Sequence, residues 1–367
     1  MVTRRIGLAR ARKAAAFTQE SLAEALHIDG ATVSNWERGK TEPLPYKRPK
    51  LAKLLGMTLA QLEELLAEGT ATSTGEPAAS VEPSTAARAG APRHGQPPGS
   101  TRLASLDYDA WVDDLERAAV CLGRQEFSLA KILLDRWTGR FTPGTHDGLG
   151  LHLYGRSLRL LGDLRQDQGV LTGPLSARQS YRKAIEVFTE VGSARRVAQL
   201  ELQLAVLDEM GGHHERAARQ YQQLSADDRL DARDRTRAEL WVGTALSKTG
   251  LSAEAVSFIL SAIQQFEALE EPQDWSVAYQ KLALAHRGAG DLRQAMAAID
   301  VALDHRPGDA PMQRVRLDTA HGHLLLSDPA TADNGLVLLE GAAATSTQYG
   351  MMHQLQAITG IRRTYEQ

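Results

Sequence analysis

The residues of this chain that could do chemistry lie mainly in its first 53 positions, and the chemistry they suggest is binding to a polyanion. Lys and Arg number 11 there and Asp and Glu number 5, which gives a local charge of +6 (11 − 5). The whole chain carries −3, so the remaining residues carry −9 (−3 − 6). A basic N-terminal segment on an otherwise acidic chain is typical of contact with nucleic acid.

Patterns that support catalysis or metal binding do not occur in the sequence. It contains no G-x-x-x-x-G-K-[ST], H-E-x-x-H, G-x-S-x-G or C-x-x-C. The single cysteine, Cys121, excludes a disulfide framework, and its apolar neighbours favour an inert buried thiol. Without nearby cysteines, the close histidine pairs His213-His214 and His321-x-His323 are expected at the surface. We therefore expect no enzyme, no cofactor and no metal site.

The elements that must position the basic residues are short helices. Apolar spacing and capping residues predict helices over 4–16, 19–26 and 30–38, with Thr18 and Asp29 as N-caps and Gly39 as a stop. The first helix is expected to turn one side inward, namely Ile6, Ala9 and Ala16. The two that follow are expected to bury Leu22, Ala23, Leu26, Ile28, Val33 and Trp36. We expect Glu37 to pair with Arg12 rather than to contact a polyanion, which would repel it.

The run TQESLAEALHIDGATVSNWERGKTEP, followed by LAKLLGMTLAQLEELL, closely resembles the lambda-repressor and Cro type of helix-turn-helix, the Xre family. The resemblance covers residues 4–67 and implies a five-helix DNA-binding domain whose helix 30–38 lies in the major groove. It implies that base edges face Gly30, Ala31, Thr32 and Asn35, and that phosphates meet Gln19, Arg38, Lys40 and Thr41. His27 stands where the family has glycine, for which we expect a small cost in stability.

Residues 69–102 differ in character from the segments on either side. They contain five of the 14 prolines and no Leu, Ile, Phe, Tyr or Trp. Such a segment cannot bury enough apolar surface to offset its ordering entropy, so it is predicted to be a disordered linker. The predicted domains are 1–68 for DNA binding, 69–102 for the linker and 103–367 for the remainder.

Residues 103–367 are predicted to be helical throughout, because their apolar residues recur at spacings of three and four residues. The expected helices are 107–123, 126–139, 147–167, 174–191, 194–210, 213–226, 231–249, 252–269, 273–288, 291–305, 310–326, 330–346 and 350–365. No segment shows apolar and polar residues in strict alternation, the pattern of a half-buried strand, so we expect an all-α protein with no sheet.

Residues 198–309 repeat. Three glycines recur at spacings of 38 (250 − 212) and 40 (290 − 250), namely Gly212, Gly250 and Gly290. When these glycines are aligned, three sets of small residues also align: Ala205 with Gly243 and Ala283, Ala217 with Ala255 and Ala295, and Ala262 with Ala302. This pattern resembles that of tetratricopeptide repeats, whose period is about 34. It predicts an α-solenoid, with less regular helix pairs at either end.

In tetratricopeptide arrays the first helix of each pair lines a concave face. Here that face would carry basic and aromatic residues, and the candidates for effector binding are Arg237, Trp241, Thr244, Lys248, Gln280, Lys281 and Arg287. Such a lining suits a peptide or small anionic effector. The alternative is an array that only forms a homodimer or docks a protein.

The sequence thus predicts a regulator of transcription that binds double-stranded DNA as a homodimer and responds to a peptide or small molecule. The other class of function is an interaction scaffold or antitoxin-like partner whose DNA-binding domain serves autoregulation. No apolar run reaches the length of a membrane span, and basic residues follow Arg4-Arg5 where an export signal would be apolar. We therefore expect a cytoplasmic protein with no membrane partner.

Overall fold

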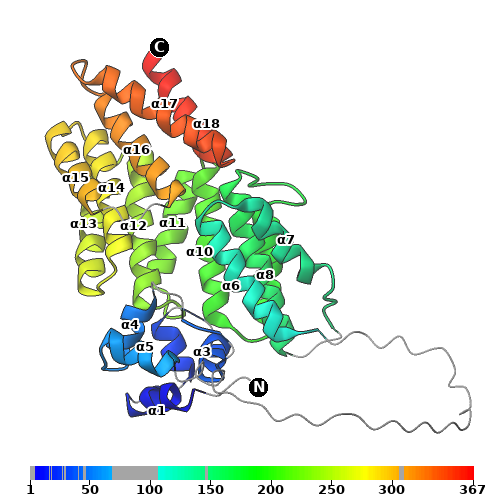
Figure 1. The fold of residues 1–367 in the computed structure, drawn as a ribbon. Coiled ribbons are helices and arrows are strands. Elements are labelled where there is room, and N and C mark those ends of the chain that lie inside the picture. Colours follow the sequence, from blue (N-terminus) through cyan, green and yellow to red (C-terminus); the bar gives the residue numbers. More distant parts are fainter. Residues whose placement is uncertain are drawn as a thin grey trace, which may run out of the picture. The chain divides into compact units, whose positions relative to one another are not determined.

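The computed structural model describes residues 5–15, 17, 19–26, 28, 30–39, 41–43, 47–67, 106–144, 148–305 and 310–367. The chain divides into two compact units, Met1–Leu106 and Asp107–Gln367 (Figure 1). Both are helical, and no strand occurs within these ranges, which confirms the predicted all-α class. The predicted linker, His27 and Lys40 lie outside the described residues.

The N-terminal unit has the five helices that the resemblance implies. They are α1 (Ile6–Ala14), α2 (Gln19–Ala25), α3 (Gly30–Glu37), α4 (Arg48–Leu54) and α5 (Leu59–Ala67). Their apolar faces form one core of Leu8, Leu22, Ala23, Leu26, Val33, Trp36, Leu51, Ala52, Leu55, Leu62 and Leu66. The residues predicted to pack α2 against α3 are all in this core, except that Ile28 packs at its margin.

The buried side of α1 differs from the prediction. Ile6 is 57% exposed, whereas Leu8 and Arg12 are 2% and 7% exposed. The expectation took the most apolar residue as the inward one. The stripe that faces α3 and α5 instead begins at Leu8 and continues at Arg12 one turn later, because Arg12 has a buried partner on α3.

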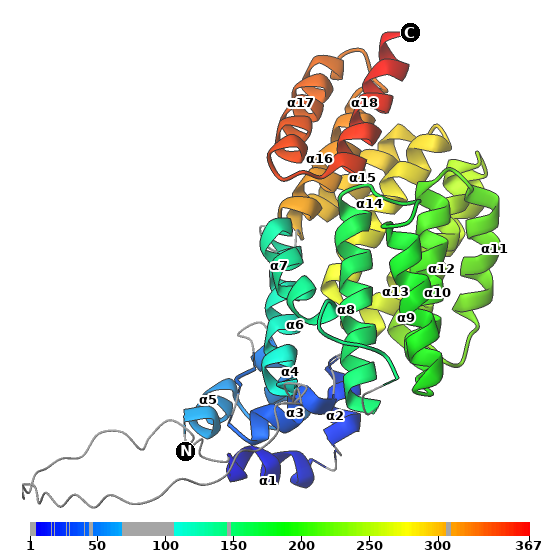
Figure 2. The ribbon, with the colours of Figure 1, turned by 90° about the vertical axis from the view of Figure 1, so that its right-hand side faces the viewer.

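The second unit stacks helices in antiparallel neighbours (Figures 1 and 2). Its helices are α6 (Tyr108–Gly123), α7 (Phe127–Thr138), α8 (Gly148–Asp167), α9 (Ala177–Glu190), α10 (Ala194–Met210), α11 (His214–Ser225), α12 (Ala232–Lys248), α13 (Ser252–Ala268), α14 (Pro272–Gly288), α15 (Leu292–Asp304), α16 (Pro311–Leu325), α17 (Ala332–Gln348) and α18 (Met352–Glu366). These bounds follow the predicted helices closely. None of the helices in the described ranges is both long and apolar enough to cross a membrane.

The repeat pattern is confirmed at its turns and at its helix contacts. Gly212, Gly250 and Gly290 each have a positive φ, of 84°, 89° and 81°, a conformation that side chains with a Cβ rarely adopt. The aligned small residues are fully buried, namely Ala205, Ala217, Ala255, Ala262, Ala283, Ala295 and Ala302. Small side chains at these positions allow neighbouring helices to approach closely.

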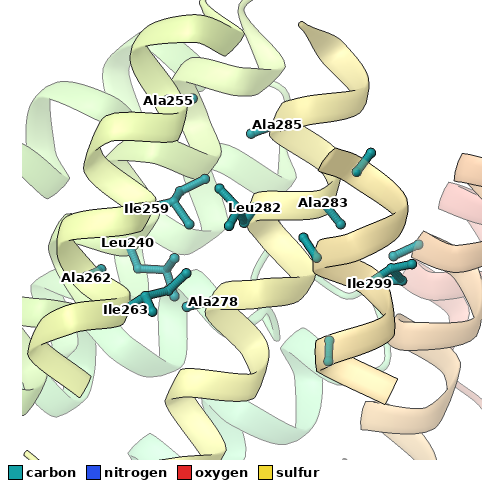
Figure 3. Packing of buried hydrophobic residues seen from close by; sticks show 14 of the residues in the cluster. Leu240, Ala255, Ile259, Ala262, Ile263, Ala278, Leu282, Ala283, Ala285 and Ile299 are labelled. Carbon is teal, nitrogen blue, oxygen red and sulfur yellow. The ribbon is translucent and has the colours of Figure 1, made fainter. Parts of the chain in front are cut away.

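Figure 3 shows the core between α12, α13, α14 and α15, where Leu240, Ile259 and Ile263 meet Leu282. Gly243 of α12 marks a close approach of α12 to α13. A Cβ on Gly243 would lie 2.6 Å from Ile259 Cγ1 and 2.9 Å from the Ala255 carbonyl oxygen. The repeat therefore requires glycine here, where the other two units have alanine.

The two ends of the array touch, which the sequence did not predict. The Gln125 side chain, between α6 and α7, accepts a hydrogen bond from the Met312 backbone N–H at 3.2 Å. Gly169, after α8, lies so close to α18 that a Cβ on it would be 3.2 Å from the His353 backbone nitrogen. The helices at 107–167 and 310–366 thus close the stack on itself, and α18 lies beside the end of α8 in both views (Figures 1 and 2).

Candidate functional sites

The helix α3 is held to α1 and α2 by a buried polar cluster. Arg12 Nε donates to Glu37 Oε1 at 2.6 Å, and the two residues are 7% and 6% exposed. This confirms the predicted pairing. Gln19 Nε2 donates to Glu37 Oε2 at 2.6 Å, so its side-chain donor is used within the unit rather than presented to a phosphate. The prediction missed this use because it placed Gln19 from the resemblance alone.

Arg5 is a second buried support that the sequence analysis did not single out. It is 2% exposed, and its guanidinium donates to the Thr41 carbonyl oxygen at 2.7 Å and to Glu42 Oε1 at 2.8 Å. Its spacing from Leu8 and Arg12, at i, i+3 and i+7, places it on the inward face of α1. That spacing was the available signal. Arg5 fixes the segment that follows α3.

The residues predicted to face bases are less accessible than expected. Thr32 and Asn35 are 3% and 2% exposed. Asn35 Oδ1 accepts a hydrogen bond from Arg38 Nη2 at 2.7 Å, and Arg38 Nε donates to the Ser34 carbonyl oxygen at 3.3 Å. The exposed Arg38 therefore holds the oxygen of the Asn35 amide, and a bidentate contact of this amide with adenine, which needs that oxygen, requires Arg38 to release it.

The other predicted contact residues lie around the same helix. Gly30 and Ala31 form the start of α3. Thr41 is half-buried, and its hydroxyl is covered and has no hydrogen-bond partner in the described part of the chain. Half-buried Ser34, which the prediction omitted, lies four residues from both Gly30 and Arg38 and thus on their side of α3.

In the second unit, the structure brings two of the predicted effector residues together. The Lys281 ammonium, on α14, lies 5.8 Å from the ring centroid of Trp241, on α12. Next to them, Lys248 Nζ donates to Glu209 Oε1 at 2.7 Å, and the Tyr221 hydroxyl donates to Glu209 Oε2 at 2.8 Å. Burial alone would raise the pKa of Glu209, but Lys248 and these hydrogen bonds hold it below its ordinary value.

Three other predicted effector residues have structural roles instead. Thr244 is 6% exposed and its hydroxyl bonds to a carbonyl of its own helix. Gln280 is 5% exposed and its Nε2 donates to the Arg316 carbonyl oxygen at 2.6 Å. Arg237 Nε donates to Asp274 Oδ1 at 2.9 Å, so its charge is already balanced. Their helical register is that of ligand-facing residues, but Gln280 and Arg237 bind groups on neighbouring elements and Thr244 binds its own helix.

Arg287, the remaining predicted residue, binds neutral groups. Its Nε donates to Ser327 Oγ at 2.8 Å and to the His323 carbonyl oxygen at 3.1 Å. Burial and the nearby Arg287 charge lower the pKa of His323 to about 4. His323 is thus a half-buried neutral group, in contrast to the predicted surface position.

Three charged or titratable residues near Lys281 and Lys248 come from helices in which the repeat pattern is weak. They are Asp167 at the end of α8, Arg316 on α16 and His353 on α18. Burial raises the pKa of Asp167 to about 6, although Arg316 acts to lower it. The spacing of 36 residues from Gln280 to Arg316 (316 − 280), close to one repeat, was the only available signal for Arg316.

A pocket of about 550 Å³ opens beside the α8–α9 connection. Its lining is Gly169, Val170, Leu171, Thr172, Arg178, Leu207, Gly211 and His213. Gly169 also packs against His353, so the pocket adjoins the place where the array closes. The pocket was not predicted because its lining comes from the α8–α9 and α10–α11 connections together with α9 and α10.

Comparison with known proteins decides the nature of the first unit. Residues 8–65 match the Helix-turn-helix family. This helix-turn-helix region runs from α1 into α5 and includes the buried supports Arg12 and Glu37. No curated protein matches the chain.

Solved structures similar to the chain include PlcR of Bacillus thuringiensis in complex with the peptide PapR7 and DNA, at 11% identity and a TM-score of 0.40, covering 82% of this chain and 93% of that one. A Rap protein complexed with competence and sporulation factor has 13% identity and a TM-score of 0.40, covering 68% and 80%. ComR of Streptococcus suis has 11% identity and a TM-score of 0.20, covering 100% and 97%.

Proposed function

We propose that the chain is a DNA-binding regulator of transcription whose helical-repeat unit binds a peptide or small-molecule effector. The observation that carries the proposal is the helix-turn-helix match over residues 8–65, together with the local charge of +6 over residues 1–53. In such units the second helix of the motif, here α3, enters the major groove. The proposed regulator acts by binding alone, without a catalytic step, in the cytoplasm.

Support for an effector comes from the second unit itself. Lys281 and Trp241 place a cation and an aromatic ring side by side, and the Trp241 ring also packs against the cores on either side of α12. The charge of Lys281 is not needed for the small-residue contacts of the array. Support for a homodimer comes from the DNA, because one helix-turn-helix reads a half-site and two half-sites give high affinity. Leu129 and Ile132 of α7, 46% and 65% exposed, offer an apolar surface for such an association.

The first test uses DNA from upstream of the gene, located by footprinting with the full-length chain. Arg38→Ala is expected to weaken binding to all DNA. It should also reduce the slope of log K against log salt concentration by about one, because one phosphate contact is lost. Asn35→Ala is expected to remove preference at one base pair, at a cost of about 1–3 kcal/mol. Because Arg38 binds the Asn35 amide, the loss of binding free energy in the double variant should differ from the sum of the losses in the two single variants by about 0.5 kcal/mol or more.

Lys13→Ala, which removes an exposed positive charge from α1, is the matched control and should change the affinity little. Equal losses on footprinted and random DNA for Asn35→Ala would show that α3 does not read bases. Isolation of the native protein with a tightly bound protein partner, and no response of DNA affinity to peptides or cell extract, would favour the scaffold function instead.

A further inference from the structure

Apart from Arg287, which binds neutral groups, the cations that the even-numbered helices bring near Glu209 and Trp241 fall into two groups. In the first group each charge is balanced by a carboxylate. Arg237 Nε lies 2.9 Å from Asp274 Oδ1, and Lys248 Nζ lies 2.7 Å from Glu209 Oε1. These pairs are part of the folded array, and a ligand would have to displace a carboxylate to use them.

The second group is Lys281 and Arg316, for which no carboxylate lies within ion-pair distance in the described part of the chain. The Lys281 ammonium lies over the Trp241 ring, 5.8 Å from its centroid. Gln280, next to Lys281 in sequence, donates to the Arg316 carbonyl oxygen at 2.6 Å, which joins α14 to α16 at this level. The two side chains therefore start from adjacent points on adjacent helices.

The charges around this pair do not balance. Burial, followed by the charges of Lys248 and Arg316, lowers the pKa of Lys281 to about 8, and Glu209 opposes this only partly. Burial and the same two cations also lower the pKa of His353 on α18. Glu209 is already bound to Lys248, and the pKa of Asp167, which faces Arg316 from α8, is raised by burial to about 6. Cations that face one another in a partly desolvated space favour the entry of an anion.

The closure of the array brings Asp167 and His353 close enough for Arg316 to act on the pKa of each, while Lys281 and Arg316 stay half-buried. Gly169 packs against His353, so the end of α8 meets the start of α18 (Figure 2). An arginine binds a carboxylate through two parallel N–H bonds, and a lysine adds a point charge beside it. Glu209 and Asp167 nearby oppose a second negative charge, which favours a carboxylate over a phosphate dianion.

We propose that Lys281 and Arg316 together bind a carboxylate group of the effector, with the Trp241 ring as the apolar surface beside it. This inference rests on the proposed function, because it names the chemistry by which the second unit recognises an effector. The carboxylate comes either from the C-terminus of a peptide or from an acidic side chain.

The test measures retention of short peptides by the full-length chain. One random pool lacks Asp and Glu and has free C-termini, a second is the same pool with amidated C-termini, and a third is amidated and carries one Asp. Peptides that co-elute with the protein on gel filtration are quantified by mass spectrometry. The site variant combines Lys281→Met with Arg316→Ala. The control combines Arg182→Ala with Lys183→Ala, two exposed cations of α9, and loses the same charge.

The wild type and the control are expected to retain at least one carboxylate-bearing pool about tenfold better than the amidated pool without Asp, and the site variant should lose this preference. A preference for the first or the third pool identifies the source of the carboxylate. If the site variant unfolds, as judged by its melting temperature, Lys281→Met alone provides the comparison. Equal retention of acidic and amidated peptides by the wild type, or a preference that survives in the folded variant, would overturn the carboxylate site and leave a peptide effector standing. Retention of no pool would overturn both.

Discussion

At the residue scale, Asp167 is a group whose ionisation is altered by its surroundings in a way that pH can reveal. Burial raises its pKa from 3.8 to about 6, Asp163 acts in the same direction and Arg316 acts against both. Below the unfolded-state pKa both states hold the proton, and the carboxyl has no effect on stability. As pH rises through the window between 3.8 and about 6, the unfolded state ionises first, so the folded state loses stability.

Asp167→Asn is therefore expected to raise the free energy of unfolding by about 1–3 kcal/mol near neutral pH and to have no effect in acid. Urea denaturation at several pH values measures this. Asp300→Asn, which changes an exposed carboxylate on α15, should give no pH-dependent difference. A gain for Asp167→Asn that is the same at all pH values would show that ionisation is not its cause.

At the scale of the element, the contact between α12 and α13 depends on the lack of a side chain at Gly243. A Cβ there would meet Ile259 and the Ala255 carbonyl oxygen at less than 3 Å, and the carbonyl belongs to helix backbone that cannot move alone. Gly243→Ala is expected to destabilise the second unit by about 1–3 kcal/mol, despite the higher helix propensity of alanine.

Gly360→Ala in α18 is the control, because no atom lies within 4 Å of the Cβ position there. This change should be neutral or stabilising, by up to about 1 kcal/mol. Thermal unfolding of both variants separates the effect of the added Cβ on helix packing from its effect on helix propensity. If the two substitutions have the same effect, the close approach of α12 and α13 is not a constraint on the repeat.

At the scale of the whole molecule, the helix-turn-helix unit has a core of its own, made of residues between Leu8 and Leu66. A fragment that ends at residue 69 is therefore expected to unfold cooperatively. It should bind DNA more weakly than the full chain, because it reads one half-site and lacks the unit assigned to dimerisation.

Circular dichroism and titration of a footprinted site with the fragment and the full chain check both expectations. The fragment mixed with a separate 107–367 chain is the control for effects that do not need the covalent link. Equal affinity of the fragment and the full chain for a palindromic site would assign dimerisation to the first unit instead.

The sequence alone determined which segments are helices, where they turn and which small residues lie between them. It also predicted the Arg12–Glu37 pair. The helices, turns and small residues depend on contacts at three or four residues along a helix or on a repeated register, and both can be read from spacing. The Arg12–Glu37 pair, 25 positions apart, was predicted instead from charge, because a polyanion would repel Glu37. Even within one helix, the choice between Ile6 and Leu8 as the inward residue failed, because the partner on α3 decided it.

Only the tertiary structure decided which polar groups remain available for binding. Spacing assigned Gln280, Arg237 and Lys281 to one face, but Gln280 and Arg237 are occupied by Arg316 and Asp274, and Lys281 is not. The charge of Arg316 acts on Asp167 although 149 positions separate them (316 − 167). Their approach follows from the small rotation that each helix pair adds to the next. The sum of these rotations, which no local spacing encodes, closes the array and places α8 beside α18.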